Sequence, residues 1–336
     1  MAKRDLFVIG GSAGSSEPLK ALMAGLPRDF PGALLITTHI AATHPSYLPA
    51  VLGAVSGIPV HGARDGHPVE PGQAYVAVPD RHLLVLGSAI RLGVGQRENL
   101  MRPSIDPMFR SAALSYGPRA VGVILSGLLS DGASGLYAVK AAGGTAVVQH
   151  PLDAAQDAMP RAALEAAEAD YVARGGDLAE VLREVAAHDA GPARPAPESL
   201  VFEVEVAAGK PLGSHLLRRF ATPAALTCPE CHGVLSEVTG EQPLRYRCQI
   251  GHAYTAEELA GQNERVDEAI RVALRVMEER VELVTRMAKD ARASGRNAVA
   301  ELYEHRAQEY SGCAATLRQA GLLSLRASRG LEAPSK

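Results

Sequence analysis

The sequence has no long apolar run, no excess of basic residues and no dense set of cysteines. Only four apolar residues, 6–9, precede the first glycine, which is too few for a signal peptide. No run approaches the roughly 18 apolar residues of a membrane span. The formal net charge of −3 argues against nucleic acid as a partner, and four cysteines in 336 residues argue against a disulfide framework. We therefore expect a cytoplasmic protein.

The amino-acid composition is ordinary for a globular protein, with 47% hydrophobic and 21% charged residues, and the chain is long enough for about two domains. From residue 6 to about 188, strand-like and helix-like runs alternate, which is typical of an α/β domain with a mainly parallel sheet. The expected strands cover 6–9, 33–37, 58–61, 74–78, 120–125 and 145–149. The expected helices cover 17–24, 45–55, 107–116, 132–142, 160–168 and 178–187. A hairpin over 83–92 is expected as an insertion in the sheet.

A proline- and alanine-rich segment, 190–197, indicates a domain boundary. We predict an α/β domain over 1–188, a linker over 189–200, a cysteine-bearing segment over 201–255, a helical hairpin over 256–325 and a disordered tail over 326–336. Strong helix formers flank a glycine break at 293–297, which favours two antiparallel helices. An apolar stripe from Val266 to Ala291 either packs on the second helix or serves a coiled-coil dimer or a partner.

Residues 6–18 combine a short apolar run, a turn of glycines and serines, and the start of a helix. Such a turn leaves Ser12 at a strand end beside unpaired helix N–H groups, which stabilise an oxyanion or a phosphate. Ser12 is thus either a nucleophile or part of a phosphate-binding loop. A dinucleotide site needs an acid after the second strand, where Thr38 and His39 stand instead, and the phosphate-loop motif is missing. The nucleotide alternative is therefore disfavoured.

Ser12, His39 and Asp131 each follow a predicted strand, so the carboxyl edge of a parallel sheet can bring them together. In that arrangement Ser12 attacks an acyl carbon, His39 takes its proton, and Asp131 orients the imidazole. Backbone N–H groups of the turn would bind the oxyanion. Each residue also has a structural explanation: Ser12 as a turn or cap residue, His39 as a strand-end histidine, and Asp131 as part of a turn.

Three cysteines and one histidine stand in the pattern C-x2-C-x16-C-x3-H, formed by Cys228, Cys231, Cys248 and His252. Thiolates and an imidazole at two tight turns suit a closed, structural zinc site. The alternatives are unrelated buried thiols or a redox pair, and His232 is a less favourable imidazole because it adjoins Cys231. Cys313, in the last predicted helix, is expected to be a plain core or surface residue.

Four ordered motifs, at residues 9–14, 38–39, 101–111 and 122–132, resemble the catalytic domain of chemotaxis protein-glutamate methylesterases of the CheB type. The similarity extends over about residues 5–185, and 159–161 fits as well. The resemblance implies a doubly wound, Rossmann-like α/β fold and hydrolysis of glutamyl methyl esters on receptor helices, with glutamine deamidation as a related reaction. It also implies Ser12, His39 and Asp131 as the triad, and no cofactor for catalysis.

Further site residues follow from these motifs. Gly11, Ala13 and Gly14 form the predicted oxyanion turn, and Arg102 either contacts the substrate through its guanidinium or forms an internal ion pair. Asp106 is interpreted as an N-cap followed by Pro107 and is left out of the site.

The sequence departs from the family pattern at several positions. Ala13 replaces a threonine, Ser15 replaces a glycine, and Leu128 and Leu129 replace the family's Met-Gly after Gly127. The chain also begins five residues before the first catalytic strand, so we expect no N-terminal receiver domain and no activation by phosphorylation of this chain.

The expected partner is a methyl-accepting receptor or similar signalling protein, and the C-terminal helices are a candidate for self-association. The rival hypotheses are an inactive scaffold that binds a signalling partner and an esterase or amidase with another substrate.

Overall fold

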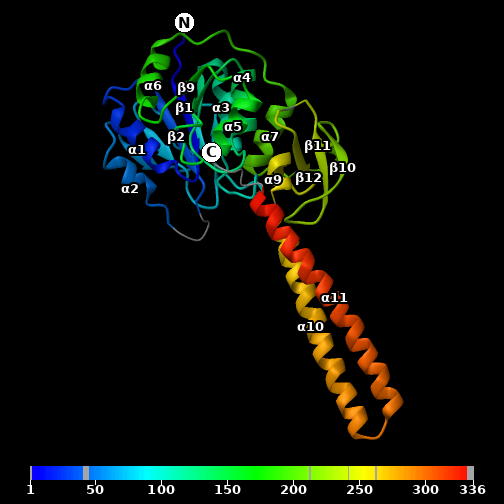
Figure 1. Ribbon diagram of the computed structural model, residues 1–336. Coiled ribbons are helices and arrows are strands. Elements are labelled where there is room, and N and C mark those ends of the chain that lie inside the picture. Colours follow the sequence, from blue (N-terminus) through cyan, green and yellow to red (C-terminus); the bar gives the residue numbers. More distant parts are fainter. Residues whose placement is uncertain (1, 41–44, 212, 241, 262, 331–336) are drawn as a thin grey trace. The chain divides into compact units, whose positions relative to one another are not determined.

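The computed structural model describes residues 2–40, 45–211, 213–240, 242–261 and 263–330. The chain divides into two compact units, Met1–Leu259 and Ala260–Lys336. A seven-stranded parallel sheet in the order β3-β4-β2-β1-β7-β8-β9 forms the centre of the first unit (Figure 1). Its strands are β1 (Leu6–Gly11), β2 (Ala33–Thr38), β3 (Val60–Gly62), β4 (Ala74–Val76), β7 (Ala120–Ile124), β8 (Thr145–Gln149) and β9 (Tyr171–Ala173).

Helices cover both faces of this sheet, which confirms the predicted doubly wound α/β fold. They are α1 (Ser16–Gly25), α2 (Leu48–Gly53), α3 (Ile105–Tyr116), α4 (Ala133–Ala141), α5 (Ala158–Ala166) and α6 (Leu178–Ala187), with a short 3-10 turn, η1 (Gly117–Arg119), after α3. Alternate residues of β1 enter two separate cores: Leu6 and Val8 pack with α3, α4 and α5, whereas Phe7 and Ile9 pack with α1, α2 and α6. Complete burial on both faces explains why β1 is a continuous apolar run.

Three details differ from the sequence prediction. The hairpin of β5 (His82–Leu86) and β6 (Ala89–Gly93) forms a two-stranded sheet of its own, so the prediction that it inserts in the main sheet was wrong. The short edge strand β9, which is only partly buried, was not predicted. The helix predicted over 45–55 is shorter, and residues 41–44 next to it lie outside the described part of the chain.

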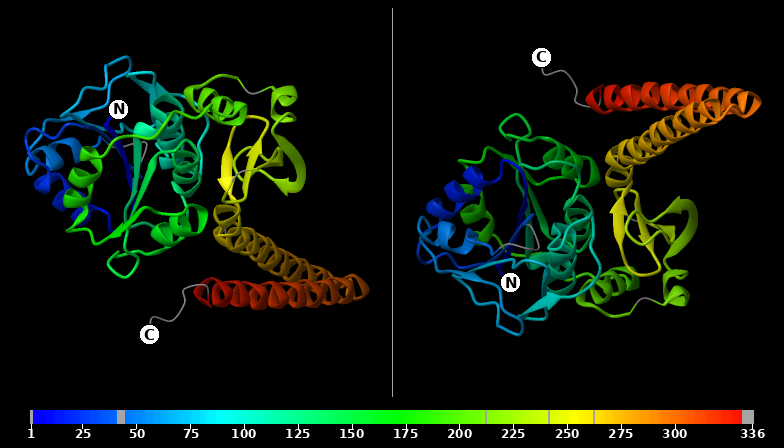
Figure 2. Two further views of the ribbon diagram at one scale, coloured as in Figure 1. Left: turned by 90° about the horizontal axis from the view of Figure 1, so that it is seen from above. Right: turned by 90° about the horizontal axis from the view of Figure 1, so that it is seen from below.

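The cysteine-bearing segment belongs to the same compact unit as the large sheet, although the proline- and alanine-rich segment precedes it. It contains α7 (Glu198–Ala208), α8 (Ser214–Leu217), an antiparallel sheet and α9 (Ala256–Ala260). The sheet has the order β10 (Ala221–Thr227), β11 (Val234–Val238), β12 (Arg245–Cys248) and β13 (Ala253–Thr255). Figure 2 shows it, in yellow-green and yellow, as a layer separate from the parallel sheet.

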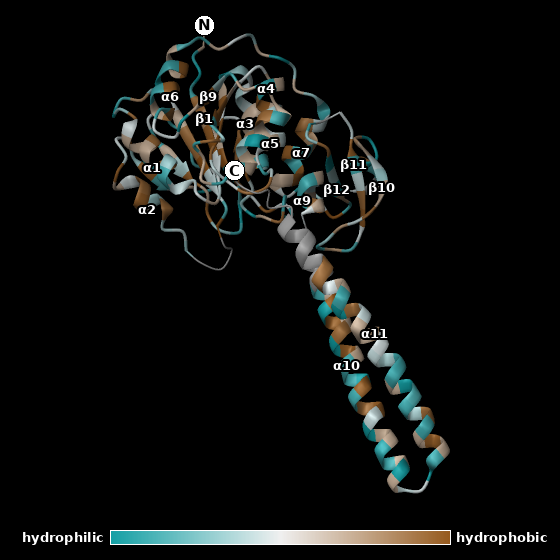
Figure 3. Cartoon of the chain, viewed as in Figure 1, coloured by the Kyte–Doolittle hydropathy of each residue, from teal (hydrophilic) through white to brown (hydrophobic). Residues whose placement is uncertain are grey.

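The second unit is a hairpin of two long helices, α10 (Asn263–Ala293) and α11 (Asn297–Gly330). Gly295, with φ of +73°, lies in the turn between them, where the break was predicted. Small residues pack between the helices, including Ala288, Ala291 and Ala300, while Leu283 is 59% exposed, and both helices mix apolar and hydrophilic positions (Figure 3). Of the predicted apolar stripe, Val284 and Ala291 are buried, whereas Met287 is 37% exposed, so within the described residues the stripe packs only partly on the second helix. The side chain of Val266 lies outside the described residues.

The predicted tail from residue 326 is helical as far as Gly330, and residues 331–336 lie outside the described chain. None of the described helices is both long and apolar enough to cross a membrane.

Candidate active site and metal centre

Ser12, His39 and Asp131 lie together at the carboxyl edge of the parallel sheet. Strand β1 runs between β2 and β7, and the three residues follow these strands. Ser12 Oγ is 2.9 Å from His39 Nδ1, and His39 Nε2 is 2.7 Å from Asp131 Oδ2. A neutral imidazole that donates from Nε2 to the carboxylate leaves Nδ1 to accept the Ser12 hydroxyl proton. The structure thus brings the three predicted residues into one hydrogen-bonded chain.

Asp131 is fully buried, and its carboxylate accepts hydrogen bonds from other groups besides the His39 imidazole. Its Oδ2 accepts the Ile105 N–H at 2.7 Å, and its Oδ1 accepts Ser104 Oγ–H at 2.8 Å and Asn99 Nδ2–H at 2.9 Å. Because Ile105 is the first residue of α3, the carboxylate also lies at the positive end of a helix. Burial alone would raise the pKa of Asp131, but the imidazole and the other donors outweigh it and lower the pKa to about 2. Asp131 is therefore a fixed anion beside His39.

The turn after β1 offers backbone donors next to Ser12. The Ser12 N–H is already bonded to the Ser126 carbonyl at 2.9 Å. Among the described residues, the N–H groups of Ala13 and Gly14 have no hydrogen-bond acceptor, so they are available to an oxyanion. Gly14 has φ of +76°, and a Cβ atom on Gly11 would come within 2.6 Å of the Ser15 Cβ. The close turn therefore depends on glycine at both positions.

Arg102 forms the internal ion pair, one of the two alternatives left by the sequence. Its Nη2 lies 2.6 Å and its Nε 3.0 Å from Asp80 Oδ1, and its Nη1 donates to the Gly95 carbonyl at 2.8 Å. Since all three guanidinium nitrogens are engaged within the domain, we leave Arg102 out of the substrate site proposed below.

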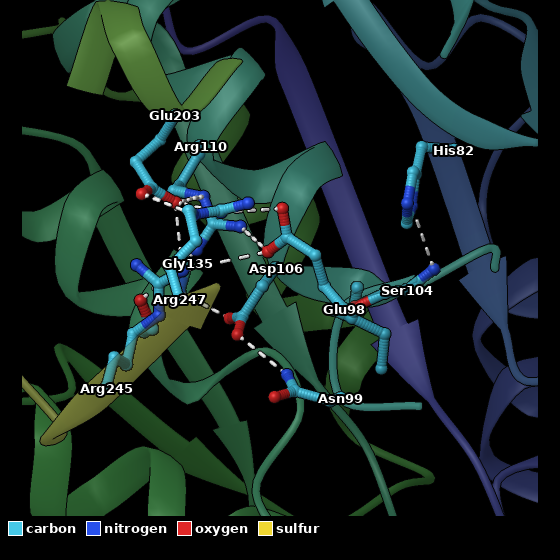
Figure 4. Close-up of polar contacts among 12 residues, drawn as sticks. His82, Glu98, Asn99, Ser104, Asp106, Arg110, Gly135, Glu203, Arg245 and Arg247 are labelled. Atoms are coloured by element: carbon cyan, nitrogen blue, oxygen red, sulfur yellow. Dashed lines mark hydrogen bonds and ion pairs between the residues drawn. The ribbon is translucent and has the colours of Figure 1, made fainter. Parts of the chain in front are cut away.

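Asp106 is a second buried carboxyl beside Asp131, and its assignment as an N-cap was wrong. Helix α3 begins at Ile105 with Ser104 as its N-cap, and Asp106 lies inside the first turn. Its carboxylate accepts the Gly135 N–H at 2.6 Å and Asn99 Nδ2–H at 3.0 Å (Figure 4). Burial, and then the charge of Asp131, raise the pKa of Asp106 to about 6. Asp106 and Asn99 thus belong to the support of the triad. The motif at 101–111 contained Asp106, but nothing in the sequence indicated that it is buried.

Glu258, on α9, is also buried near the triad, at 4% exposure. Its Oε1 lies 3.5 Å from the Ser130 N–H. Burial, and then the charge of Asp131, raise the pKa of Glu258 to about 8. A carboxyl whose pKa is raised on folding lowers the stability of the folded state as the pH rises. The loss accumulates between the pKa of the carboxyl in the unfolded chain, near 4.5, and its pKa in the folded protein.

Glu258→Gln should therefore be more stable than the wild type, with a difference that grows between about pH 5 and 8 and then levels off. We expect a rise in Tm on the order of 5 °C at pH 8, measured by calorimetry, because the amide keeps the size of the side chain and removes the cost of ionising it. The exposed neighbour Glu257 provides the control Glu257→Gln, with a change within about 0.5 kcal/mol. A Tm difference that does not change with pH would contradict the burial of an ionisable Glu258.

The predicted metal ligands also meet in space. Cys228 and Cys231 lie in the turn between β10 and β11, whereas Cys248 ends β12 and His252 directly precedes β13. Their four ligand atoms are within 4.8 Å of one another. Cys231 Sγ is 3.6 Å from Cys248 Sγ, and His252 Nδ1 is 3.4 Å from Cys248 Sγ. Ligands on a tetrahedral zinc ion would be about 3.5–3.8 Å apart, so these side chains fit such an ion.

A carboxylate holds the imidazole of this cluster in place. His252 Nε2 lies 2.8 Å from Glu230 Oε2, which leaves Nδ1 directed at the sulfur atoms. Such a carboxylate–histidine pair is a common outer contact of zinc sites. His232, the weaker alternative, is not in the cluster, and its N–H closes the turn on the Cys228 carbonyl at 2.9 Å. Cys313 is exposed on α11.

A buried charge cluster joins the cysteine-bearing sheet to the parallel-sheet part of the unit. It consists of two carboxylates and three guanidinium groups, each at most 1% exposed: Glu98, Glu203, Arg110, Arg245 and Arg247. Arg247 contacts both carboxylates (Figure 4). Its Nη1 also donates to the Gly251 carbonyl. The charges of Arg247, Arg245 and Arg110 outweigh the burial of Glu203 and hold its pKa well below the usual range. The cluster fixes β12 against α3 and α7.

Comparison with known proteins agrees with this geometry. The family model for the CheB methylesterase matches residues 7–182. A protein of Leptospira interrogans named as a protein-glutamate methylesterase/protein-glutamine glutaminase is 38% identical over 178 residues, which cover 53% of this chain and 92% of that protein. One of Anaeromyxobacter dehalogenans with the corresponding name is 37% identical over 184 residues, 55% of this chain and 54% of its own.

Among solved structures, the CheB methylesterase catalytic domain of Thermotoga maritima matches with a TM-score of 0.52 and 30% identity. The match covers 55% of this chain and 99% of that domain. The family match ends at residue 182, so the cysteine cluster lies beyond it. By its fold, its hydrogen-bonded Ser12, His39 and Asp131 and these similarities, the chain belongs to the CheB methylesterase family.

Proposed function

We propose that this protein is a serine hydrolase that removes methyl esters from glutamyl side chains of a receptor or signalling protein. The observation that carries the proposal is the hydrogen-bonded chain from Ser12 Oγ through His39 to the buried anion Asp131. His39 Nδ1 accepts the hydroxyl proton while Ser12 Oγ attacks the ester carbon, and the N–H groups of Ala13 and Gly14 stabilise the oxyanion. His39 then returns the proton to the departing methanol.

The second half of the reaction uses the same groups. His39 takes a proton from a water molecule, which attacks the acyl-serine ester, and the glutamate product leaves as Ser12 recovers its proton. A glutamine side chain would follow the same path with ammonia as the leaving group. The names of the Leptospira and Anaeromyxobacter relatives include both reactions and support both for this chain.

A panel of substrates tests this assignment. Receptor fragments carrying glutamyl methyl esters, the same fragments carrying glutamine, and a simple short acyl ester would be incubated with the full chain, and methanol and ammonia measured. We expect methanol from the first, with ammonia from the second at a lower rate. Turnover of the simple ester alone would point to another substrate. If zinc-loaded protein released no product from any of these substrates, the result would favour the inactive scaffold. The altered residues Leu128 and Leu129 are the reason for considering that alternative.

We further propose that Cys228, Cys231, Cys248 and His252 bind a structural zinc ion that holds the two turns of the small sheet together. Four protein ligands leave no position for substrate, so the ion would stabilise the fold rather than take part in the reaction. Metal analysis of the purified chain should find about one zinc per chain, and less in Cys248→Ser. Well under one metal per wild-type chain would refute the site.

Self-association through α10 and α11 stays a prediction.

A further inference from the structure

The loop that carries Asn99 pairs with β13 of the cysteine-bearing sheet. The Asn99 N–H donates to the Ala253 carbonyl at 2.8 Å, and the Thr255 N–H donates to Asn99 Oδ1 at 3.1 Å. Glu98 and Ala253 form an isolated parallel bridge. Asn99 has φ of +50°, a conformation that a non-glycine residue rarely adopts without such support. Strand β13 therefore sets the position of the Asn99 side chain.

Asn99 carries this contact directly to the triad. Its amide group has one acceptor oxygen and two N–H donors. The oxygen binds Thr255, and the nitrogen donates to Asp131 Oδ1 at 2.9 Å and to Asp106 Oδ2 at 3.0 Å. The amide is buried, so each of these bonds is costly to lose. One side chain thus links Thr255 to the carboxylate that orients His39.

A second set of hydrogen bonds connects Thr255 to Ser130, the residue before Asp131. Ser130 Oγ lies 2.7 Å from Thr255 Oγ1, and both hydroxyls are buried. The Thr255 hydroxyl also accepts the Glu258 N–H at 3.1 Å, and Glu258 Oε1 receives the Ser130 N–H. Thr255 therefore contacts the residues on both sides of the catalytic carboxylate, through its backbone and through its hydroxyl.

We propose that Thr255 is a positioning residue for Asp131, so that the cysteine-bearing sheet is a working part of the triad's support rather than an appended module. The inference rests on the proposed function, in which the His39–Asp131 pair acts on the substrate. Residues 253–258 lie outside the region that matches the family model, so this support comes from the part of the chain beyond the shared catalytic domain.

Three variants of the full chain separate positioning from packing. Thr255→Val keeps the branched shape and the backbone bond to Asn99 but removes the hydroxyl that bonds Ser130 and accepts the Glu258 N–H. Thr255→Ser restores that hydroxyl without the methyl group. The matched control is Thr239→Val, because Thr239 lies in the same sheet region, is exposed, and among the described residues donates its hydroxyl only to the Phe220 carbonyl.

Two readouts report on the triad independently of the natural substrate. One is the downfield NMR resonance of the His39 Nε2 proton shared with Asp131, and the other is the rate at which a serine-directed phosphonate labels Ser12. Thr255→Val should move or broaden the resonance and slow labelling roughly tenfold, the effect expected when the buried hydrogen bond to Ser130, the neighbour of Asp131, is lost. Thr255→Ser should restore both readouts to near the wild-type values, and Thr239→Val should leave both unchanged.

The substrate assay keeps this inference separate from the proposed function. In methanol release, Thr255→Val should lower kcat about tenfold with KM within about twofold, since the change acts on the triad and not on substrate binding. A wild-type resonance and labelling rate in Thr255→Val, even with a lower Tm, would overturn the positioning role. If the wild type released no methanol while Thr255→Val still altered the resonance, the assigned reaction would fail and the positioning role would stand.

Discussion

Replacing Ser12 by alanine is expected to lower ester hydrolysis by at least about 10³-fold and to abolish covalent labelling. Ser12 Oγ is the atom that forms the acyl bond, and removal of a serine nucleophile costs this much or more in other serine hydrolases. The hydroxyl bonds only to His39 among the described residues, and Ser12 lies partly exposed at the end of β1. The loss should therefore come without a loss of fold. Peptide mass spectrometry of the phosphonate adduct and methanol release measure the two effects.

A matched serine provides the control. Ser88 is exposed in the turn between β5 and β6, far in sequence from each member of the triad, and Ser88→Ala should keep the wild-type rate and adduct. Calorimetry should give Ser12→Ala a Tm close to that of the wild type. An adduct that persists in Ser12→Ala, or appears on another residue in the wild type, would remove Ser12 from the nucleophile role.

Glu203→Gln is expected to destabilise the first unit by about 3–5 kcal/mol, because it leaves buried guanidinium groups without one of their two carboxylates. Glu203 contacts Arg247 and lies 2.9 Å from Arg245 Nη2, and all three side chains are at most 1% exposed. For a unit of this size, the loss corresponds to a fall in Tm of roughly 10 °C. Because the cluster joins β12 to α3 and α7, the small sheet and the parallel sheet should then lose stability together.

The same helix provides the comparison. Glu205 is half exposed and pairs with Lys210 at the surface, so Glu205→Gln should change the stability by no more than about 1 kcal/mol. Thermal unfolding of both variants by calorimetry at pH 7 measures the difference. Equal Tm values for the two variants would mean that the buried cluster contributes little to holding the sheets together.

The sequence was sufficient for the central strands of the parallel sheet, because β1, β2 and β7 are buried on both faces and read as mainly apolar runs. Residues 6–9, 33–37 and 120–125 were each recognisable in this way, and polar residues follow each run. Once these strands are adjacent and parallel, Ser12, His39 and Asp131 must lie near one edge. The cysteine cluster was equally readable, because ligands of one metal ion come in close pairs along the chain.

The residues that support the triad could not be predicted from the sequence in the same way. Thr255 bonds Asn99 across more than 150 residues, and neither belongs to a short motif with a known spacing. Whether Asp106 and Glu258 are buried depends on elements packed over them from elsewhere in the chain. Arg102 had two possible partners, and only the position of Asp80 in the fold decided between them. The separate sheet of β5 and β6 depends on pairing, which alternation of apolar residues does not specify.

The nucleophile and the substrate class are tested together by the release of labelled methanol from methyl-esterified receptor fragments, compared between the wild type and Ser12→Ala. We expect clear release by the wild type and loss of that release in the variant. Equal release by both proteins would contradict Ser12 as the nucleophile. No release by the zinc-loaded wild type would contradict the assignment of glutamyl methyl esters as the substrate.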